Sequence, residues 1–210
     1  ELGFDYVFDT NFSADFTIME EGSEFIERFT HRDDYAWPMF TSCCPGWVRF
    51  LKTEFPDYTE NLSTAKSPQQ MFGSLVKTYY AEQAGIDPHD IFVVSIMPCT
   101  AKKMEAKRPN SFTKGEQDTD IVLTTTELTR MIKNFGIAFD KIEPEACDMP
   151  FGIGSGGGVI FGVTGGVMEA ALRTVYEIIT GRELPFPNLH VSPIVGLEEI
   201  REATIQLETV

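Results

Sequence analysis

The 210-residue chain has little cysteine, few basic residues and no long hydrophobic run. Four cysteines, two of them adjacent, are too few for a disulfide framework, so we expect reduced thiols and a cytoplasmic location. Seventeen lysines and arginines against 32 acidic residues give a net charge of −15. This charge argues against nucleic acid or an anionic membrane as partner, because binding phosphate requires a cationic surface. No stretch approaches the roughly 18 consecutive apolar residues of a membrane span.

The remaining composition is that of a folded protein, with 42% hydrophobic and 12% aromatic residues. Short apolar runs alternate with helical patterns, which predicts an α/β fold built of parallel-sheet lobes with helices on the faces. The predicted strands are 6–8, 39–41, 91–97, 121–124, 190–195 and 203–207. The predicted helices are 13–29, 45–55, 67–85, 127–136 and 167–180, and 110–118 is expected to be an exposed loop.

Three of the four cysteines follow predicted strands. Residues 41–47 read TSCCPGW and residues 97–103 read MPCTAKK, so Cys43, Cys44 and Cys99 each lie where a strand gives way to a helix. Ligands bind at this edge of a parallel sheet, and a helix N-terminus favours the thiolate that serves as metal ligand or proton carrier. The spacing contains no C-x-x-C pair, and ordinary buried cysteines explain the pattern equally well.

Both segments resemble the first and second signatures of the iron-only (FeFe) hydrogenases, at every characteristic position and in the same order. Supporting stretches also resemble that family, and together the likeness covers essentially the whole chain. They are residues 8–12, 17–21, 67–70 and 159–172. The resemblance implies the catalytic-domain fold of that family.

The family's cofactor is the H-cluster, a 4Fe-4S cubane held by four cysteines and joined to a two-iron unit with CO, cyanide and dithiolate ligands. The resemblance implies that Cys44 and Cys99 are cubane ligands, and that Cys43 passes protons to and from the dithiolate. It implies that Lys102 donates a hydrogen bond to a cyanide. It also implies that five residues pack around the two-iron unit: Pro68, Gln69, Met97, Phe161 and Gly162.

One family signature is absent from these 210 residues. The third signature supplies the other two cubane cysteines as a Cys-x-x-x-Cys pair followed by glycines, and no such pair occurs. Cys147 matches no family ligand, and we interpret it as a structural or surface thiol. We therefore expect residues 1–210 to be an incomplete catalytic domain that is inactive in isolation.

Glu21, Glu24 and Arg28 fall at i, i+3 and i+7 and share one helical face. Their spacing alone favours a solvated stripe with an i,i+4 pair between Glu24 and Arg28. The resemblance instead implies that these residues and Ser63 form a proton-transfer chain between the surface and Cys43. Carboxylates, hydroxyls and thiols can alternately donate and accept protons, as such a chain requires.

Residues 152–157 match G-x-G-x-x-G, a pattern of nucleotide-binding loops, but no predicted strand precedes them. Close approach of the backbone to a buried cofactor explains the glycines between 154 and 166 at least as well. The three histidines have no metal-ligand spacing, and we expect surface or turn roles for His31, His89 and His190.

The resemblance implies an enzyme that reversibly reduces protons to H2, with electrons from ferredoxin or a similar carrier and an H-cluster installed by maturation proteins. The alternative is a non-catalytic relative, either an Fe–S assembly protein or a hydrogen-sensing regulator. Such relatives tend to depart at the positions of Cys43, Lys102 or the proton chain. All of these positions are intact here, so catalysis is favoured.

Overall fold

The computed structural model describes residues 1–149, 151–152, 154–185, 192–194 and 197–205. Its α-helices are α1 (Asn11–Thr30), α2 (Pro45–Glu54), α3 (Pro68–Leu75), α4 (Ala81–Ala84), α5 (Ala101–Glu105), α6 (Thr125–Asn134), α7 (Gly156–Ile160) and α8 (Gly166–Thr180). Its strands are β1 (Val94–Met97), β2 (Phe112–Thr113), β3 (Glu116–Gln117), β4 (Ile121–Thr124), β5 (Ser192–Ile194) and β6 (Leu197–Glu202).

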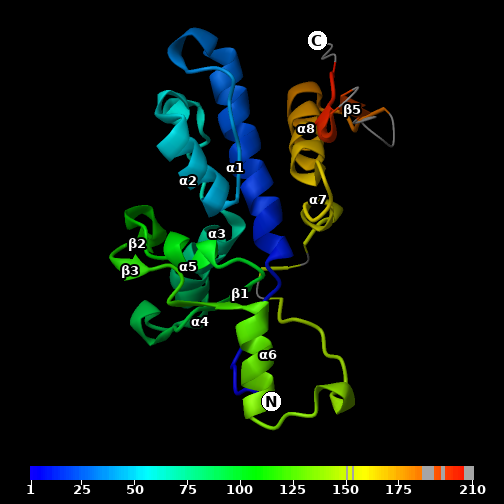
Figure 1. Cartoon of the computed structure of the whole chain (residues 1–210). Helices are drawn as coiled ribbons and strands as arrows, with labels where there is room; N and C mark the ends of the chain where they lie inside the picture. Colours follow the sequence, from blue (N-terminus) through cyan, green and yellow to red (C-terminus); the bar gives the residue numbers. More distant parts are fainter. Residues whose placement is uncertain (150, 153, 186–191, 195–196, 206–210) are drawn as a thin grey trace.

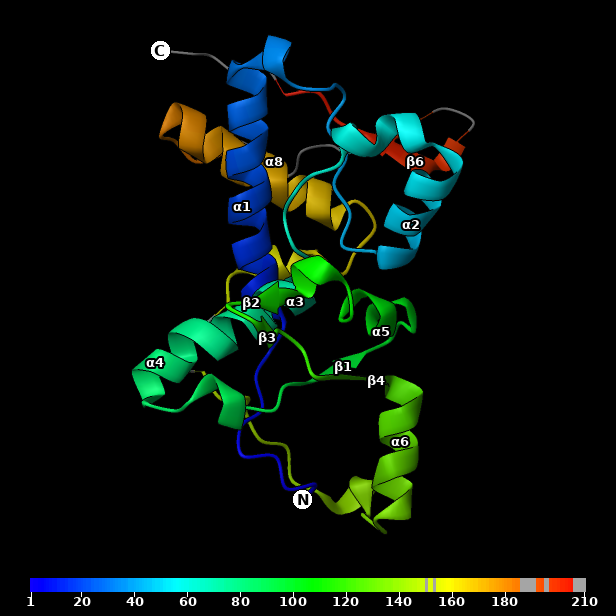
Figure 2. The same ribbon diagram turned by 90° about the vertical axis from the view of Figure 1, so that its left-hand side faces the viewer.

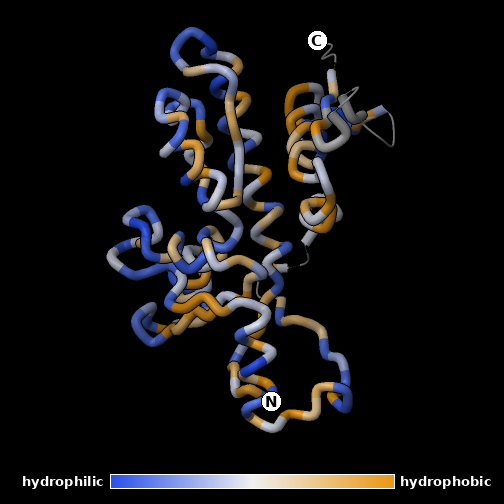
Figure 3. The backbone as a smooth tube through the Cα atoms, in the orientation of Figure 1, coloured by the Kyte–Doolittle hydropathy of each residue, from blue (hydrophilic) through white to orange (hydrophobic). Residues whose placement is uncertain are grey.

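The long helix α1 is the centre of the upper part of the molecule, with α2 on one side and α8 on the other (Figure 1). Small and branched apolar side chains are buried where α1 and α8 pack, among them Ile18 and Val175. A Cβ on Gly22 would lie 3.5 Å from Val175 Cγ2, so the glycine allows close packing of the two helices. Figure 3 shows that α8 is hydrophobic along most of its length. This packing fixes α1, which carries the predicted proton chain.

The helix boundaries follow the local signals in the sequence. Pro45 and Pro68 occupy the first positions of α2 and α3, where a missing backbone N–H costs nothing. Thr124 and Glu127 form a capping box at the start of α6. A π-helical turn (Val76–Tyr80) joins α3 to α4, so the predicted helix over 67–85 is continuous but not uniformly α-helical.

The parallel sheet is a pair of strands, β1 and β4, which run side by side in Figure 2. Val94 pairs with Ile121 and Met97 with Thr124. The mixture of helices and parallel strands confirms the predicted fold class. The expected strand over 91–97 was too long and too buried: it begins at Val94, and Phe92 is 67% exposed. Only β4 pairs with β1 among the described residues, so the apolar run has one neighbouring strand rather than the two of a central strand.

Two other short predicted strands are reduced to single parallel bridges, Phe8 with Asp148 and Phe40 with Leu62. The expectation of an exposed loop over 110–118 is only partly met: residues 110, 112, 114 and 115 are exposed, but the segment is not an irregular loop. It contains the hairpin β2–β3, turned by Lys114 and Gly115 at positive φ, and it is buried at both ends, at Ser111 and Asp118. Polar side chains suggested solvent there, but they are used for internal hydrogen bonds.

Near the C-terminus, β5 pairs antiparallel with β6. A strand was expected at 203–207, but β6 lies at 197–202 instead. The many charged residues of 197–202 gave no strand signal, and pairing with β5 outweighs this low propensity. Residues 190–191, 195 and 206–207 of the two predicted strands lie outside the described residues. Within the described ranges, no helix combines the length and the apolar character needed to cross a membrane.

Candidate active site

The two cysteine motifs meet at Lys102. Its backbone N–H donates to the Cys99 carbonyl at 3.1 Å, and its Nζ donates to the Cys43 carbonyl at 2.8 Å. Cys43 and Cys99 are half-buried and Cys44 is exposed, so they are not ordinary buried cysteines. As predicted, Cys44 directly precedes α2 and Cys99 follows β1.

Cys44 is the N-cap of α2. Its Sγ accepts the Trp47 backbone N–H at 3.5 Å, and Ser42 Oγ accepts the Cys44 N–H at 3.1 Å. Amide groups at a helix N-terminus stabilise negative charge on the sulfur, which suits a metal ligand. Among the described residues, no group of three or more His, Cys, Asp or Glu side chains is arranged to hold a metal ion.

Glu105 is a site residue that the sequence analysis missed. Its Oε2 accepts from Lys102 Nζ at 2.9 Å and from Ser67 Oγ at 3.0 Å, with Gln69 Nε2 at 3.4 Å. Lys102 and Glu105 are each 8% exposed, so each of the two buried charges is stabilised by the opposite charge of the other. The available signal was an acid three residues after Lys102, on the same side of a short helix.

Gln69 connects the Lys102–Glu105 pair to strand β1. Its Oε1 accepts from Ser95 Oγ of β1 at 3.0 Å, while its Nε2 also faces the Lys102 carbonyl at 3.4 Å. The start of α3 is therefore tied to both the strand and the helix that flank Cys99. Pro68 is buried beside Gln69, and Met97 is half-buried at the end of β1.

The Cys43 thiol lies among three charged or acidic groups. Burial raises its pKa, the Lys102 ammonium opposes that rise, and Glu21 and Cys44 add to it. The Glu21 carboxylate, the first acid of the predicted chain, is thus one of the charges that act on the thiol. This arrangement favours the protonated thiol, which is the form that can donate a proton.

Glu21 is buried in α1 at 6% exposure. Its pKa is raised to about 7, mainly by burial and secondly by the neighbouring Glu24 charge. A carboxyl that is half-protonated near neutral pH can both accept and release a proton.

Glu24, Arg28 and Ser63 form one hydrogen-bonded network. Ser63 Oγ donates to Glu24 Oε2 at 2.6 Å, and Arg28 donates to Glu24 Oε1 from Nη2 at 2.7 Å and from Nε at 3.0 Å. Arg28 is only 4% exposed and also donates to the carbonyls of Glu60 and Leu62. The interpretation as a solvated stripe was wrong, because the loop over 60–64 covers this face of α1.

Phe161 and Gly162 lie elsewhere in the described structure. They follow α7, which packs on α1 and α8 (Figure 1). Phe161 is half-buried and Gly162 is exposed. No hydrogen bond or ring contact in the described part of the chain joins them to Cys43 or Lys102.

The glycine-rich segment is occupied by a side chain of α1. The Asp15 carboxylate accepts from the Ser155 N–H and Oγ and from the Gly158 N–H, the last at 2.6 Å. These amides are therefore not available for phosphate, which argues against a nucleotide loop. A Cβ on Gly158 would lie 2.4 Å from the Asn11 carbonyl oxygen. The glycines thus permit close approach, as expected, but to α1 rather than to a cofactor.

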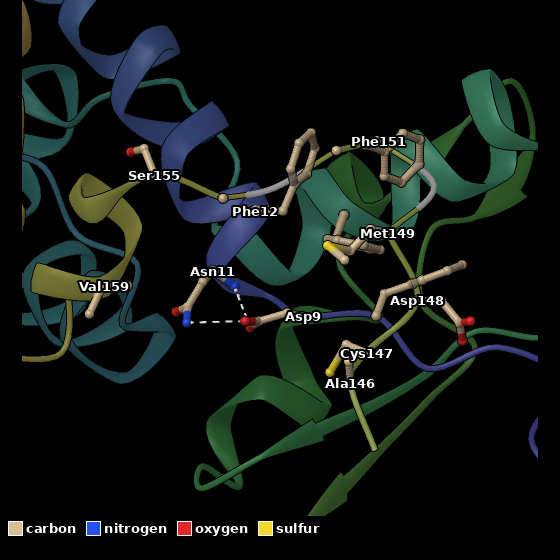
Figure 4. Close-up of a pocket in the computed structure, with 14 residues that line it drawn as sticks. Asp9, Asn11, Phe12, Ala146, Cys147, Asp148, Met149, Phe151, Ser155 and Val159 are labelled. Atoms are coloured by element: carbon tan, nitrogen blue, oxygen red, sulfur yellow. Dashed lines mark hydrogen bonds between the residues drawn. The ribbon is translucent and has the colours of Figure 1, made fainter. Parts of the chain in front are cut away.

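A cavity of about 270 Å³ lies between the start of α1 and residues 146–149, 151–152 and 154–155 (Figure 4). Cys147, Asp9 and Phe12 are among its lining residues, which do not include Cys43, Cys44, Cys99 or Lys102. Cys147 is exposed, in agreement with a surface thiol. His31 and His89 are exposed beside Glu27 and Glu116, and His190 lies outside the described residues.

Comparison with known proteins gives consistent results. The family described as iron only hydrogenase large subunit, C-terminal domain, matches residues 1–210. The periplasmic Fe hydrogenase large subunit of Nitratidesulfovibrio vulgaris is 49% identical over 207 residues, covering 99% of this chain and 49% of that protein. The cytosolic Fe-S cluster assembly factor narfl of Xenopus tropicalis is 35% identical over 207 residues, covering 93% of this chain and 41% of that protein.

Among solved structures, the apo FeFe-hydrogenase HydA1 of Chlamydomonas reinhardtii, variant C377H, matches with a TM-score of 0.84 at 48% identity. The match covers 99% of this chain and 52% of that one. The chain thus spans between about a third and a half of the length of the hydrogenases that it matches.

Proposed function

The chain belongs to the iron-only hydrogenase family, and we propose on this premise that its protein catalyses the reversible reduction of protons to H2. The observation that carries the proposal is the meeting of both cysteine motifs at Lys102. The charge of a buried acid, Glu21, also acts on the Cys43 thiol. A cationic site next to a proton-carrying thiol and carboxyl provides what proton reduction needs from the protein.

The residues present fit part of an H-cluster site. Cys44 and Cys99 would be two cubane ligands, since thiolates suit iron–sulfur clusters and the Cys44 sulfur already faces a helix N-terminus. Pro68, Gln69 and Met97 would line the two-iron unit, and we propose the same role for Phe161 and Gly162, which follow α7. When bound, the cluster would supply the electrons and the metal centre at which H2 is made.

Cys43 would hold and release the proton closest to the cluster. Glu21 would exchange protons with Cys43, since its charge acts on the thiol and its own pKa is raised to about 7. Glu24 and Ser63 share a hydrogen bond of 2.6 Å and would continue the path, and Arg28 would orient Glu24.

Lys102 would bind the anionic cyanide, and Glu105 would position it. The ammonium is held between the Cys43 carbonyl and the Glu105 carboxylate, which fixes its direction. Lysine is suited to this role because its compact charge carries several rotatable donors.

The second candidate is a role in Fe–S cluster assembly, which the likeness to the assembly factor narfl of Xenopus tropicalis favours. Hydrogen sensing is the other non-catalytic function that the sequence left open. Retention of Cys43, Lys102, Glu21 and the hydrogen-bonded network of Glu24, Arg28 and Ser63 supports catalysis over both.

We also propose ferredoxin or a similar carrier as electron donor, and maturation proteins as partners that install the cluster. The cytoplasmic location expected from the reduced thiols stays a proposal, since one relative is named a periplasmic hydrogenase. The isolated 210-residue chain is proposed to be inactive.

Anaerobic expression of the full-length protein with hydrogenase maturation proteins tests the proposal. We expect H2 evolution with a reduced viologen dye and infrared bands of bound CO and cyanide. An assembly factor would contain Fe–S iron but give neither H2 nor these bands, and that result would contradict the proposal. A sensor would show the bands with little turnover.

A further inference from the structure

Strand β1 contains a serine in an otherwise apolar run. Residues 91–97 read IFVVSIM, and Ser95 is their single polar side chain. Ser95 and Met97 are two residues apart in β1 and so lie on one face of the strand. The half-buried Ser95 hydroxyl is therefore on the same face as the first residue of the second cysteine motif, and the proposed H2 chemistry gives it no role.

The Ser95 hydroxyl is the hydrogen-bond donor to Gln69. Its Oγ lies 3.0 Å from Gln69 Oε1, which has no other hydrogen bond in the described part of the chain. The other end of this amide, Nε2, lies 3.4 Å from the Lys102 carbonyl and 3.4 Å from Glu105 Oε2. Both of these groups only accept, so they fix the NH2 group toward α5 and the amide oxygen toward β1.

A chain of hydrogen bonds therefore runs from Ser95 to Lys102. Ser95 donates to Gln69, and Gln69 donates to Glu105. The same carboxylate oxygen, Oε2, accepts from Lys102 Nζ at 2.9 Å. The exposed fraction of the two middle members is 3% for Gln69 and 8% for Glu105. In buried surroundings the hydrogen bonds of a chain polarise one another, so a change at one end affects the other end.

Loss of the Ser95 hydroxyl would leave Gln69 Oε1 as a buried acceptor without a donor. Folded proteins avoid unpaired buried polar groups, so the Gln69 amide would turn from its present position. Such a turn moves Nε2 away from Glu105, whose carboxylate is then held by Ser67 and Lys102 alone.

Lys102 has one donor left for a bound anion. Its ammonium carries three N–H groups, of which one goes to the Cys43 carbonyl at 2.8 Å and one to Glu105. The direction of the third N–H follows from the other two. A shift of Glu105 therefore also changes the direction in which Lys102 can bind an anion.

We propose that Ser95 is a positioning residue for Lys102, acting through Gln69 and Glu105. No hydrogen bond in the described part of the chain joins Ser95 to Lys102 directly. The inference rests on the proposed function insofar as the third N–H of Lys102 would meet the cyanide. The coupling between Ser95 and Lys102 itself requires no cluster and can be measured without one.

A double-mutant cycle tests this coupling in the full-length protein expressed without maturation proteins. Ser95→Ala and Lys102→Met are made singly and together, and chemical denaturation gives the stability of each protein. We expect the two effects to be non-additive, because Gln69 and Glu105 connect the two residues. Additive effects would overturn the proposal. If Lys102→Met does not fold, Glu105→Gln takes its place.

Ser74→Ala provides the control cycle with the same Lys102 variant. The Ser74 hydroxyl is also half-buried and hydrogen-bonds to another side chain, Thr113 Oγ1, at 2.9 Å. No hydrogen bond of the described residues joins Ser74 to Gln69 or Lys102, so the two effects should add. Equal non-additivity in both cycles would overturn the proposal, because the coupling would then not depend on the Ser95 chain.

Infrared spectra of the matured full-length protein test the direction of the third N–H. Ser95→Ala should shift the bands of bound cyanide, whereas Ser95→Thr keeps the hydroxyl and should leave them at the wild-type positions. Unshifted cyanide bands in Ser95→Ala would overturn the proposal. Matured wild type without CO and cyanide bands would contradict the proposed function instead, and the cycle would then decide the positioning role alone.

Discussion

At the scale of single residues, the site depends on one buried charge pair. The Lys102 ammonium can be held inside the protein because Glu105 neutralises it and three further donors or acceptors surround the two groups. Removing one partner of a buried pair leaves the other charge uncompensated, which costs far more than loss of an exposed pair. Glu105 is therefore as important as Lys102 for keeping this charge pair inside the folded protein.

We expect Glu105→Gln to lower the free energy of unfolding by about 3 kcal/mol, because it leaves a buried ammonium without its carboxylate. Chemical denaturation of the purified protein measures this. Glu127→Gln is the matched control: Lys103 and Glu127 also pair at 2.7 Å, but their side chains are 38% and 40% exposed. The control should lose much less stability, and equal losses would contradict the account of Glu105.

The raised pKa of Glu21 leads us to expect that the free energy of unfolding depends on pH. Its pKa is about 7 in the folded protein against 4.5 for an ordinary carboxyl, so between these values the folded state binds more protons than the unfolded state. Stability from this group is therefore lost as the pH rises from 4.5 to 7, by about 3 kcal/mol in total.

Glu21→Gln removes that loss. The melting temperature of the variant minus that of wild type should therefore increase as the pH rises from 5 to 8. Thermal unfolding of both proteins across this range measures the difference. Glu20→Gln, at an exposed neighbouring position, serves as control and should show no such trend. A constant difference between Glu21→Gln and wild type across the range would show that Glu21 is not buried in the acid form.

The sequence was informative about single residues wherever a motif was present. Both cysteine motifs, Lys102 and the acids of α1 were found from the printed residues, and the structure brings Cys43, Cys99 and Lys102 together. Their catalytic roles stay predictions. Glu105 was missed because its importance comes from side chains that are distant in sequence, Ser67 and Gln69.

At the scale of elements, close contacts between backbones determine where glycine is needed. Gly158 of α7 lies against the start of α1, and Asp15 caps α7 through three donors. A pattern of glycines shows that something approaches closely but not what it is. This is why the sequence suggested a cofactor where α1 is found.

Gly158→Ala should destabilise the protein by about 1–3 kcal/mol, because the added methyl group would lie 2.4 Å from the Asn11 carbonyl oxygen and α1 must shift. Gly156→Ala in the same helix has nothing within 4 Å of the added Cβ and should be neutral or slightly stabilising. Denaturant unfolding of both variants checks this. A Gly158→Ala variant as stable as wild type would mean that α7 does not pack on α1 as described.

The longer helices were predictable because their signals are local, such as a proline at the first position or glycines at the ends. The five-residue helices α5 and α7 were not predicted, because they are too short to show a periodic apolar pattern. Strands were not, because pairing partners are set by the whole fold. The apolar run at 91–97 indicated a buried strand, yet only its last four residues pair and Phe92 remains exposed.

At the scale of the whole molecule, we propose that the chain provides only part of a cluster site. Two of its cysteines match cubane ligands, and it spans about half the length or less of the hydrogenases that it matches.

Anaerobic reconstitution of the 210-residue chain with iron and sulfide should therefore yield far less than four irons per chain, because a 4Fe-4S cubane is held by four cysteine thiolates and this chain is proposed to supply two. Iron analysis and electron paramagnetic resonance measure the outcome. The full-length protein, reconstituted in parallel, is the control. A fully occupied cubane on the 210-residue chain would show that the ligand assignment is incomplete.

The central claim is that Cys43 carries protons to and from the cluster and does not ligate it. The most direct test compares H2 evolution and iron content of Cys43→Ser in the matured full-length protein, with Cys147→Ser as control. We predict that Cys43→Ser loses nearly all activity with iron content close to wild type, and that Cys147→Ser keeps both. Full activity in Cys43→Ser, or loss of cluster iron from it, would contradict the claim.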